Sequence, residues 1–199
     1  MTAKTVLFWR HGQTDFNVEG RFQGQTDVPL NDTGRRQAEE AARLLSGLSP
    51  ELIVASDLSR AAETAEKLAR IVGVETVHDA RLREAAFGEW EGSIRAEVAE
   101  TWPDELAEWV SGADVAPPGG ESRSESGQRV AAAITDIVDT ATVDTIVIVA
   151  HGAVLRGAAE ILLGLTGTGR LGVLGNCGHG EFGCSERGWV LRSWGTTLR

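Results

Sequence analysis

The 199-residue sequence has only two cysteines, and it has no apolar run long enough to cross a membrane. A membrane-spanning helix needs about 20 apolar residues, whereas the run near the start, Val6–Trp9, is far shorter. No small-residue cleavage site follows it, which argues against a signal peptide. Cys177 and Cys184 are too few for a disulfide framework, as expected in a reducing compartment. These absences predict a cytoplasmic protein.

Positive charge is also scarce. Lys and Arg total 19 against 29 Asp and Glu, which gives a net charge of −10. Without a basic tract, the chain is a poor partner for nucleic acids or anionic membranes. An acidic enzyme can still bind phosphate if its pocket contains a local cluster of cations. The sequence also lacks an internal repeat, a low-complexity tract and an interdomain linker, so we expect one domain over residues 1–199. It has no Walker A lysine, which argues against a P-loop nucleotide site.

Apolar strand patterns and amphipathic helix patterns alternate along the chain, which predicts a mostly parallel sheet. We expect strands at 5–9, 52–55, 74–77 and 145–149, and helices at 35–45, 58–72, about 94–100, 105–110, from Ser122 to about 139, and 153–163. Two further strands, near 173–182 and 189–193, flank a turn at 185–188 and predict a hairpin. The predicted fold is α/β: a single three-layer domain with helices on both faces of the sheet and an edge hairpin.

Three helices have candidate capping signals at their N-termini. Asn31 or Asp32 is expected to cap the first helix, and the pair Ser56-Asp57 the second. Ser122 and Glu125 have the spacing of a capping box. The segment from about 88 to 122, which ends in a Pro- and Gly-rich stretch, is expected to form a small cap or flap.

Reactive side chains stand where the expected strands end. Arg10 and His11 end the first strand, His151 follows the last parallel strand, and Arg60 lies in the first turn of the helix after the second strand. Ligands of such sheets bind outside the carboxyl ends of the strands. Arginines bind phosphate oxygens bidentately, a neutral histidine nitrogen can attack phosphorus, and a second, protonated histidine can stabilise the developing charge. These four residues therefore predict a local cationic phosphate site.

Four segments, in this order, resemble the signatures of the histidine phosphatase superfamily, the phosphoglycerate-mutase-like group. They are residues 10–14 with Asn17, residues 56–65, residues 82–92 and residues 150–152. The similarity in order and placement extends over nearly the whole chain. It implies a metal-independent phosphomonoesterase with no cofactor, which acts on a small-molecule phosphate ester through a phosphohistidine.

The resemblance also assigns residues to roles. His11 would be the nucleophile, Glu84 the acid and then the base, and Arg10, Arg60 and His151 would hold the phosphoryl group. The substrate-binding residues would be Asn17, Gln23, Gly24 and Gly152. The absence of a side chain at Gly12 and Gly152 would let the backbone approach the substrate. One departure is Glu63, where the signature has glutamine. It stands three residues after Arg60 and is expected to pair with that arginine.

Several positions admit more than one interpretation. Glu89 and Glu91 lie near Glu84 and compete with it for the acid role. The pattern G-x-G-x-x-G at 167–172 follows a helix rather than a strand, which argues against dinucleotide binding. Cys177, His179 and Cys184 fit no common zinc spacing and are interpreted as residues of the tail strands, so no metal site is predicted.

Three functions fit these residues: a phosphatase, a cofactor-dependent phosphoglycerate mutase, and a non-catalytic phosphate-binding regulatory module. The presence of every reactive residue type argues against the last. Mutases of the family carry a longer insertion between the acid and the last histidine, which excludes water; here Glu84 and His151 lie only 67 positions apart. The short segment favours hydrolysis of sugar or glycerate phosphates. Segments 10–18 and 118–123 look similar to actinobacterial phosphatases of the family, and the edge hairpin offers a surface for a homodimer.

Overall fold

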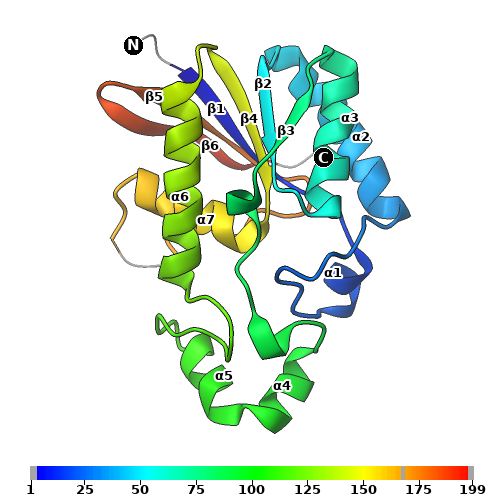
Figure 1. The fold of residues 1–199 in the computed structure, drawn as a ribbon, viewed down its shortest axis with the longest axis vertical. Helices are drawn as coiled ribbons and strands as arrows, with labels where there is room; N and C mark the ends of the chain where they lie inside the picture. The colour runs from blue at the N-terminus through cyan, green and yellow to red at the C-terminus, as the bar shows by residue number, and fades with distance from the viewer. Residues whose placement is uncertain (1–3, 167–168, 197–199) are drawn as a thin grey trace.

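The structure is a computed structural model that describes residues 4–166 and 169–196 (Figure 1). Its centre is a six-stranded sheet with the strand order β3-β2-β4-β1-β5-β6. The strands are β1 (Lys4–Arg10), β2 (Leu52–Ala55), β3 (Thr76–His78), β4 (Thr145–Ala150), β5 (His179–Ser185) and β6 (Gly188–Thr196). The helices are α1 (Asp15–Glu19), α2 (Asp32–Leu45), α3 (Ser59–Val72), α4 (Arg95–Thr101), α5 (Pro103–Val110), α6 (Arg123–Thr140) and α7 (Gly152–Leu162).

The sheet is mostly parallel, which confirms the predicted fold class. Strands β1, β2, β3 and β4 pair in parallel, whereas β5 is antiparallel to β1 and forms the predicted hairpin with β6. Two boundary predictions were wrong. β3 begins at Thr76 rather than 74, and residues 173–178 form a loop before β5 rather than the start of a strand. The glycines at 172, 175 and 178 interrupt the apolar run and weaken it as a strand.

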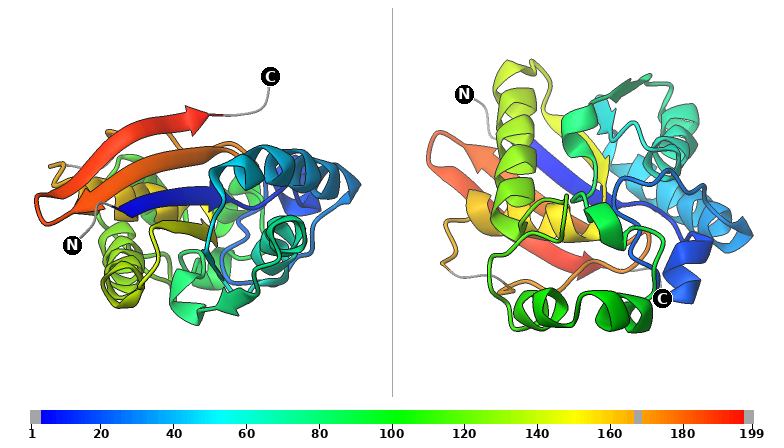
Figure 2. Two further views of the ribbon diagram at one scale, coloured as in Figure 1. Left: turned by 90° about the horizontal axis from the view of Figure 1, so that it is seen from above. Right: turned by 60° about the horizontal axis from the view of Figure 1, so that its bottom comes forward.

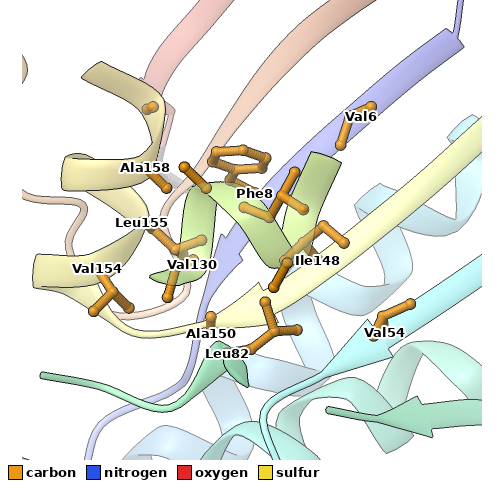
Figure 3. Packing of buried hydrophobic residues seen from close by; sticks show 14 of the residues in the cluster. Val6, Phe8, Val54, Leu82, Val130, Ile148, Ala150, Val154, Leu155 and Ala158 are labelled. Atoms are coloured by element: carbon orange, nitrogen blue, oxygen red, sulfur yellow. The ribbon is translucent and has the colours of Figure 1, made fainter. Parts of the chain in front are cut away.

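Alternate residues of β1 enter two different cores, because successive side chains of a strand point to opposite faces of the sheet. Val6 and Phe8 pack with residues of α6 and α7, as Figure 3 shows. Leu7 and Trp9 pack with residues of α2 and α3 on the other face. All four side chains are fully buried. The middle of β1, Val6–Trp9, is therefore apolar on both faces of the sheet, and helices cover both faces (Figure 2).

The helix caps follow two of the three predictions. Asn31 caps α2 through Gly34, and Ser122 and Glu125 form the expected capping box of α6. The predicted cap of α3 was wrong, because Leu58 occupies the N-cap position and makes no side-chain bond. Asp57 instead forms an ion pair with Arg83, so its carboxylate is directed away from the helix N-terminus.

Helices α4 and α5 lie apart from the sheet, beyond the carboxyl ends of the parallel strands (Figure 1). They belong to segment 88–122 and enclose a small apolar cluster of Trp90, Val98 and Leu106, against which Trp109 packs. Pro103 begins α5, a position that suits proline because its missing N–H has no partner there in any helix. Within the described residues, no helix is long and apolar enough to cross a membrane.

Candidate active site

The structure brings together the reactive residues that the sequence places at strand ends. His11 follows β1, His151 follows β4, and Arg60 comes from the first turn of α3. The two imidazole rings lie 5.1 Å apart between centroids. His11 is 2% exposed, and both His151 and Arg60 are fully buried. Adjacent parallel strands end at the same edge of the sheet, so this meeting follows from the topology.

One ring nitrogen of His11 is held by the backbone. Nδ1 lies 2.7 Å from the carbonyl oxygen of Gly12, which can only accept, so Nδ1 carries the proton and donates it. Nε2 then keeps its lone pair. Burial, followed by the charges of Arg10 and Arg60, lowers the pKa of His11 well below its usual 6.5. His11 is therefore a neutral imidazole with one nitrogen available as a nucleophile.

His151 has the opposite arrangement of ring protons. Its Nδ1 accepts a hydrogen bond from Nε of Arg60 at 3.2 Å, so the proton of the neutral ring lies on Nε2. That Nε2 is buried and has no partner among the described residues. Burial, then Arg60 and His11, lower the pKa of His151 well below 6.5. The sequence led us to expect a protonated His151; the structure instead favours a neutral ring that donates from Nε2, because burial and the nearby arginines disfavour a further positive charge.

Arg60 is held on three sides. Its Nη1 and Nη2 donate to the carbonyl oxygens of Thr26 and Gly24, at 2.8 and 2.7 Å, in addition to the bond with His151. Burial lowers its pKa to about 10. The predicted pairing with Glu63 is wrong. Glu63 accepts from Nε of Arg35 on α2, at 2.9 Å, because α2 packs beside that side of α3 whereas Arg60 faces the sheet edge.

Arg10 is the second arginine of the site, and its charge acts on both His11 and Arg60. Its Nη1 donates to the carbonyl of Leu174 at 2.5 Å, while its buried Nε has no partner among the described residues. Gly152 packs against it, since a Cβ there would lie 3.2 Å from that Nε and 2.9 Å from Val173. Arg10 therefore approaches the N-terminus of α7 closely because residue 152 has no side chain.

Gly12 has a different reason for its lack of a side chain. A Cβ at this position would lie 2.4 Å from the carbonyl oxygen of Gly34. The expectation that Gly12 makes room for substrate is therefore replaced by a packing requirement. The loop after β1 must pass against the first turn of α2.

Glu84 lies at the start of α7, although it comes from the loop before segment 88–122. Its Oε2 accepts from the backbone N–H of Ala153, and its Oε1 accepts from those of Val154 and Ala85, at 3.0–3.2 Å. The free N–H groups of a helix N-terminus favour a carboxylate. Arg129 on α6 holds the loop, since its guanidinium donates to the carbonyl of Glu84. The side chain of Glu84 is half-buried.

The competing acids are arranged differently. Glu91 is saturated with donors, because it accepts from the backbone N–H groups of Gln25, Thr26 and Phe87 and from the hydroxyl of Thr26. It braces the loop that carries Gly24. Glu89 is exposed on the outside of that segment. Neither carboxylate has the position of Glu84 at the end of α7.

The predicted substrate-binding residues line one side of the site. Oδ1 of Asn17 accepts from the backbone N–H of Thr14 at 3.1 Å, and Gln23 is buried with its Oε1 accepting from the Thr14 hydroxyl. Gly24 takes a positive φ of 52° and gives its carbonyl to Arg60. Asn17 and Gln23 thus both bond to Thr14 in the loop after the nucleophile, and Gly24 bonds to Arg60.

The sequence did not indicate the contribution of the loop before β5. Leu174 supplies a carbonyl to Arg10, and Asn176 donates to the carbonyl of His11 and to Oδ1 of Asn17. A sequence pattern does not reveal contacts of backbone carbonyls, and an Asn that follows a glycine, as Asn176 does, is typical of a turn. The pattern at 167–172 lies partly outside the described residues. Within them, no group of three acidic, histidine or cysteine residues could hold a metal ion.

The fold and this pair of histidines between two arginines define a class of protein. Residues 6–197 match the model of the histidine phosphatase superfamily (branch 1), and the chain belongs to that family.

Particular relatives carry two different names. Glucosyl-3-phosphoglycerate phosphatase of Mycobacterium tuberculosis is 39% identical over 173 residues, which cover 83% of this chain and 78% of the relative. The probable phosphoglycerate mutase GpmB of Salmonella choleraesuis is 33% identical, over 95% of this chain and 89% of its own. A solved structure of mycobacterial glucosyl-3-phosphoglycerate phosphatase with VO3 superposes with a TM-score of 0.90, at 36% identity, over 98% of this chain and 100% of that chain.

Proposed function

We propose that this protein is a metal-independent phosphomonoesterase that hydrolyses small phosphorylated metabolites, such as sugar or glycerate phosphates, through a phosphohistidine on His11. One observation carries the proposal: a buried, neutral His11 with a free Nε2 faces His151 and lies between Arg10 and Arg60. A nucleophile of this kind needs an uncharged nitrogen, and a phosphate dianion needs fixed cations and N–H donors around it.

The first chemical step transfers the phosphoryl group to the enzyme. Nε2 of His11 attacks phosphorus while the P–O bond to the leaving alcohol breaks, and Glu84 gives its proton to the departing oxygen. Arg10, Arg60 and the Nε2–H of His151 bind the non-bridging oxygens, on which charge accumulates. Asn17 adds its side-chain N–H to the same group. The N–H groups at the start of α7 hold Glu84 within reach of the leaving group.

The second step returns the phosphoryl group to water. Glu84, now a carboxylate, takes a proton from the attacking water, the P–N bond breaks, and inorganic phosphate leaves with His11 neutral again. We assign the charge neutralisation to the two buried arginines rather than to a metal ion. The carbonyls of Leu174, Gly24 and Thr26 keep both guanidinium groups in place for both steps.

The mutase is the second candidate, and GpmB of Salmonella favours it as a relative by name. A mutase must keep water away while the phosphoryl group returns to a substrate oxygen. Only 67 positions separate Glu84 from His151, and this short connection supports hydrolysis. The phosphatases among the relatives are also more similar to this chain, at 39% against 33% identity. A regulatory module that binds without reacting is the least supported, since every reactive side chain is in place.

Three further features belong to the same proposal. Segment 88–122 serves as a cap over the site within a single domain, supported by the position of α4 and α5 beyond the strand ends (Figure 1). The unpaired cysteines fit the cytoplasm, and the negative charge fits a small-molecule substrate rather than a nucleic acid. The exposed edge of β6 offers a surface for a homodimer, which sedimentation analysis would measure.

The test uses a chromogenic aryl phosphate in an excess of chelator, with the purified protein and its His11→Ala variant. Turnover that persists in chelator and disappears in the variant supports the proposal. An acid-labile phosphoenzyme should form in the native protein alone. If the native protein is inactive, 3-phosphoglycerate with a bisphosphate primer tests the mutase. Chelator-sensitive turnover would overturn the metal-independent mechanism.

A further inference from the structure

A cavity of about 450 Å³ lies beside the reaction centre, between the end of α5, the first turns of α6 and the outer side of α7. Its walls are largely apolar and include Phe87, Trp109, Ile161, Leu165 and Val173. None of the five catalytic side chains lines it. A volume of this size accommodates a small organic molecule, or part of one.

The cavity adjoins the reaction centre along the N-terminus of α7. Ala153 lines the cavity, and its backbone N–H bonds to the carboxylate of Glu84. Val173, which also lines the cavity, lies against Gly152, and Gly152 in turn packs against Arg10. A group that leaves toward Glu84 therefore lies at the entrance of this cavity, and the leaving alcohol of a phosphate ester is such a group.

Two arginines line the cavity without an acidic partner. Arg156, on α7, makes no hydrogen bond or ion pair within the described residues. Arg123, at the start of α6, stacks on Trp109 at 4.2 Å and donates to the carbonyls of Trp109 and Ala113. Asp114 is nearby, but its carboxylate bonds to Ser124. Burial, followed by the charge of Arg156, lowers the pKa of Arg123, and the nearby carboxylate of Asp114 opposes this shift.

The acidic side chains that line the cavity already have partners. Glu121 forms an ion pair with Arg129 at 2.7 Å and also accepts from the N–H of Ala86. Glu160 is 5% exposed, and its two oxygens accept from the N–H groups of Gly169 and Leu171. No acidic side chain that lines the cavity forms an ion pair with Arg156 or Arg123, although the net charge of the protein is −10. Unpaired cations side by side repel each other, and an anion would relieve that repulsion.

We propose that this cavity is a leaving-group subsite in which Arg156 and Arg123 bind a carboxylate on the alcohol part of the substrate. The inference rests on the proposed phosphatase function and narrows its substrates to phosphate esters of hydroxy acids. Arg156 lies three residues after Ala153, which is nearly one helical turn or about 5 Å along the axis of α7. The carboxylate thus binds a few bonds away from the ester oxygen that Glu84 protonates. The apolar walls accept the remainder of the molecule.

A matched pair of substrates tests this subsite. 3-Phosphoglycerate and glycerol 3-phosphate share their chain and phosphate ester and differ in a carboxylate against a hydroxymethyl group. We expect the native enzyme to release phosphate from 3-phosphoglycerate with a kcat/KM about tenfold higher or more, the worth of one charge-assisted contact. Arg156→Gln should reduce the ratio of the two kcat/KM values by about tenfold. Arg123→Gln should do the same, although it also removes bonds that hold α5.

Arg43→Gln is the control, because it removes the same charge from an exposed site on α2 and should leave the ratio unchanged. A native ratio near one, or an Arg156 variant that keeps the native ratio, would overturn the subsite. An equal loss of kcat/KM on both substrates would also overturn it, because Arg156 would then have only a structural role. A melting curve of the variant would show the accompanying loss of stability. The proposed function is judged separately: turnover of an aryl phosphate without a carboxylate preference removes only the subsite, whereas no turnover of any ester removes the phosphatase itself.

Discussion

The side-chain amide of Asn176 donates to Oδ1 of Asn17 at 3.1 Å and to the backbone carbonyl of His11 at 3.3 Å. The same Oδ1 accepts from the backbone N–H of Thr14. With its oxygen occupied by donors, the amide of Asn17 must direct its NH2 group elsewhere, which fixes the orientation of that amide. Asn176 therefore holds the loop of His11 and the amide of Asn17, the group that we propose as a phosphate-binding donor.

Replacement of Asn176 should weaken phosphate binding without unfolding the protein. Asn176→Ala is expected to lower kcat/KM about tenfold, since roughly one hydrogen bond to the substrate loses its geometry. Asn176→Asp should not rescue it, because a carboxylate cannot donate to Oδ1 of Asn17. Inhibition by orthovanadate, measured for Asn17→Ala, Asn176→Ala and the double variant, provides the check. Fully additive losses in that cycle would mean that the two residues act independently.

Arg60→Lys should lower both activity and stability. A lysine has the charge but not the fork, so it cannot donate to Gly24, Thr26 and His151 together. At least one buried acceptor is then unsatisfied, at a cost of about 1–3 kcal/mol. Urea unfolding measures this loss. Arg35→Lys, at a half-exposed pair with Glu63, is the matched control and should change stability by less than about 1 kcal/mol. Equal effects of the two substitutions would contradict the role given to Arg60.

The two buried histidines predict a pH dependence of stability. Their pKa values are lowered in the folded protein, whereas the unfolded chain binds protons near pH 6.5. The unfolded state therefore gains more protons as the pH falls below about 6.5, and the free energy of unfolding should decrease by up to about 1.4 kcal/mol per pH unit for each histidine. Unfolding curves between pH 7.5 and 5 measure this slope. It should become shallower in His11→Asn and in His151→Asn, and an unchanged slope in both would refute the assignment.

The same shift predicts how activity responds to acid. His11 stays neutral below pH 6.5, so the acidic limb of the profile of kcat/KM should lie below that value. An acidic limb centred at 6.5 would indicate a nucleophile with an unperturbed pKa.

Glu84→Gln should separate substrates by their leaving groups. The substitution removes the proton donor, so alkyl phosphates should lose about 10²–10⁴ in kcat/KM. An aryl phosphate, whose leaving group needs little protonation, should lose much less in the phosphorylation step, and phosphoenzyme should accumulate because the base for water is missing. Rapid-quench measurements distinguish the two steps. Glu89→Gln, at an exposed carboxylate five residues away, should behave like the native enzyme; if it loses activity instead, the acid has been misassigned.

Much of the fold could be predicted because it depends on local patterns. The β-branched run at 145–149, the capping box at Ser122 and the turn at 185–188 are local signals, and the structure has a strand, a helix start and a hairpin at those places. The cap of α3 could not be predicted in this way. Asp57 has the residue type of an N-cap, but Arg83, from a distant part of the chain, is a stronger partner for its carboxylate.

By itself, the sequence determined the α/β class and the meeting of His11, Arg60 and His151, because residues that follow parallel strands must share one edge of the sheet. The tertiary structure alone decided the protonation of both histidines. Burial between two arginines favours neutral rings, and the carbonyl of Gly12 and the guanidinium of Arg60 select opposite tautomers. It also decided which carboxylates accept hydrogen bonds, as Glu91 does, and which arginines have no hydrogen-bond partner among the described residues, as is the case for Arg156. Those properties depend on distances between segments remote in sequence, and a linear pattern does not encode them.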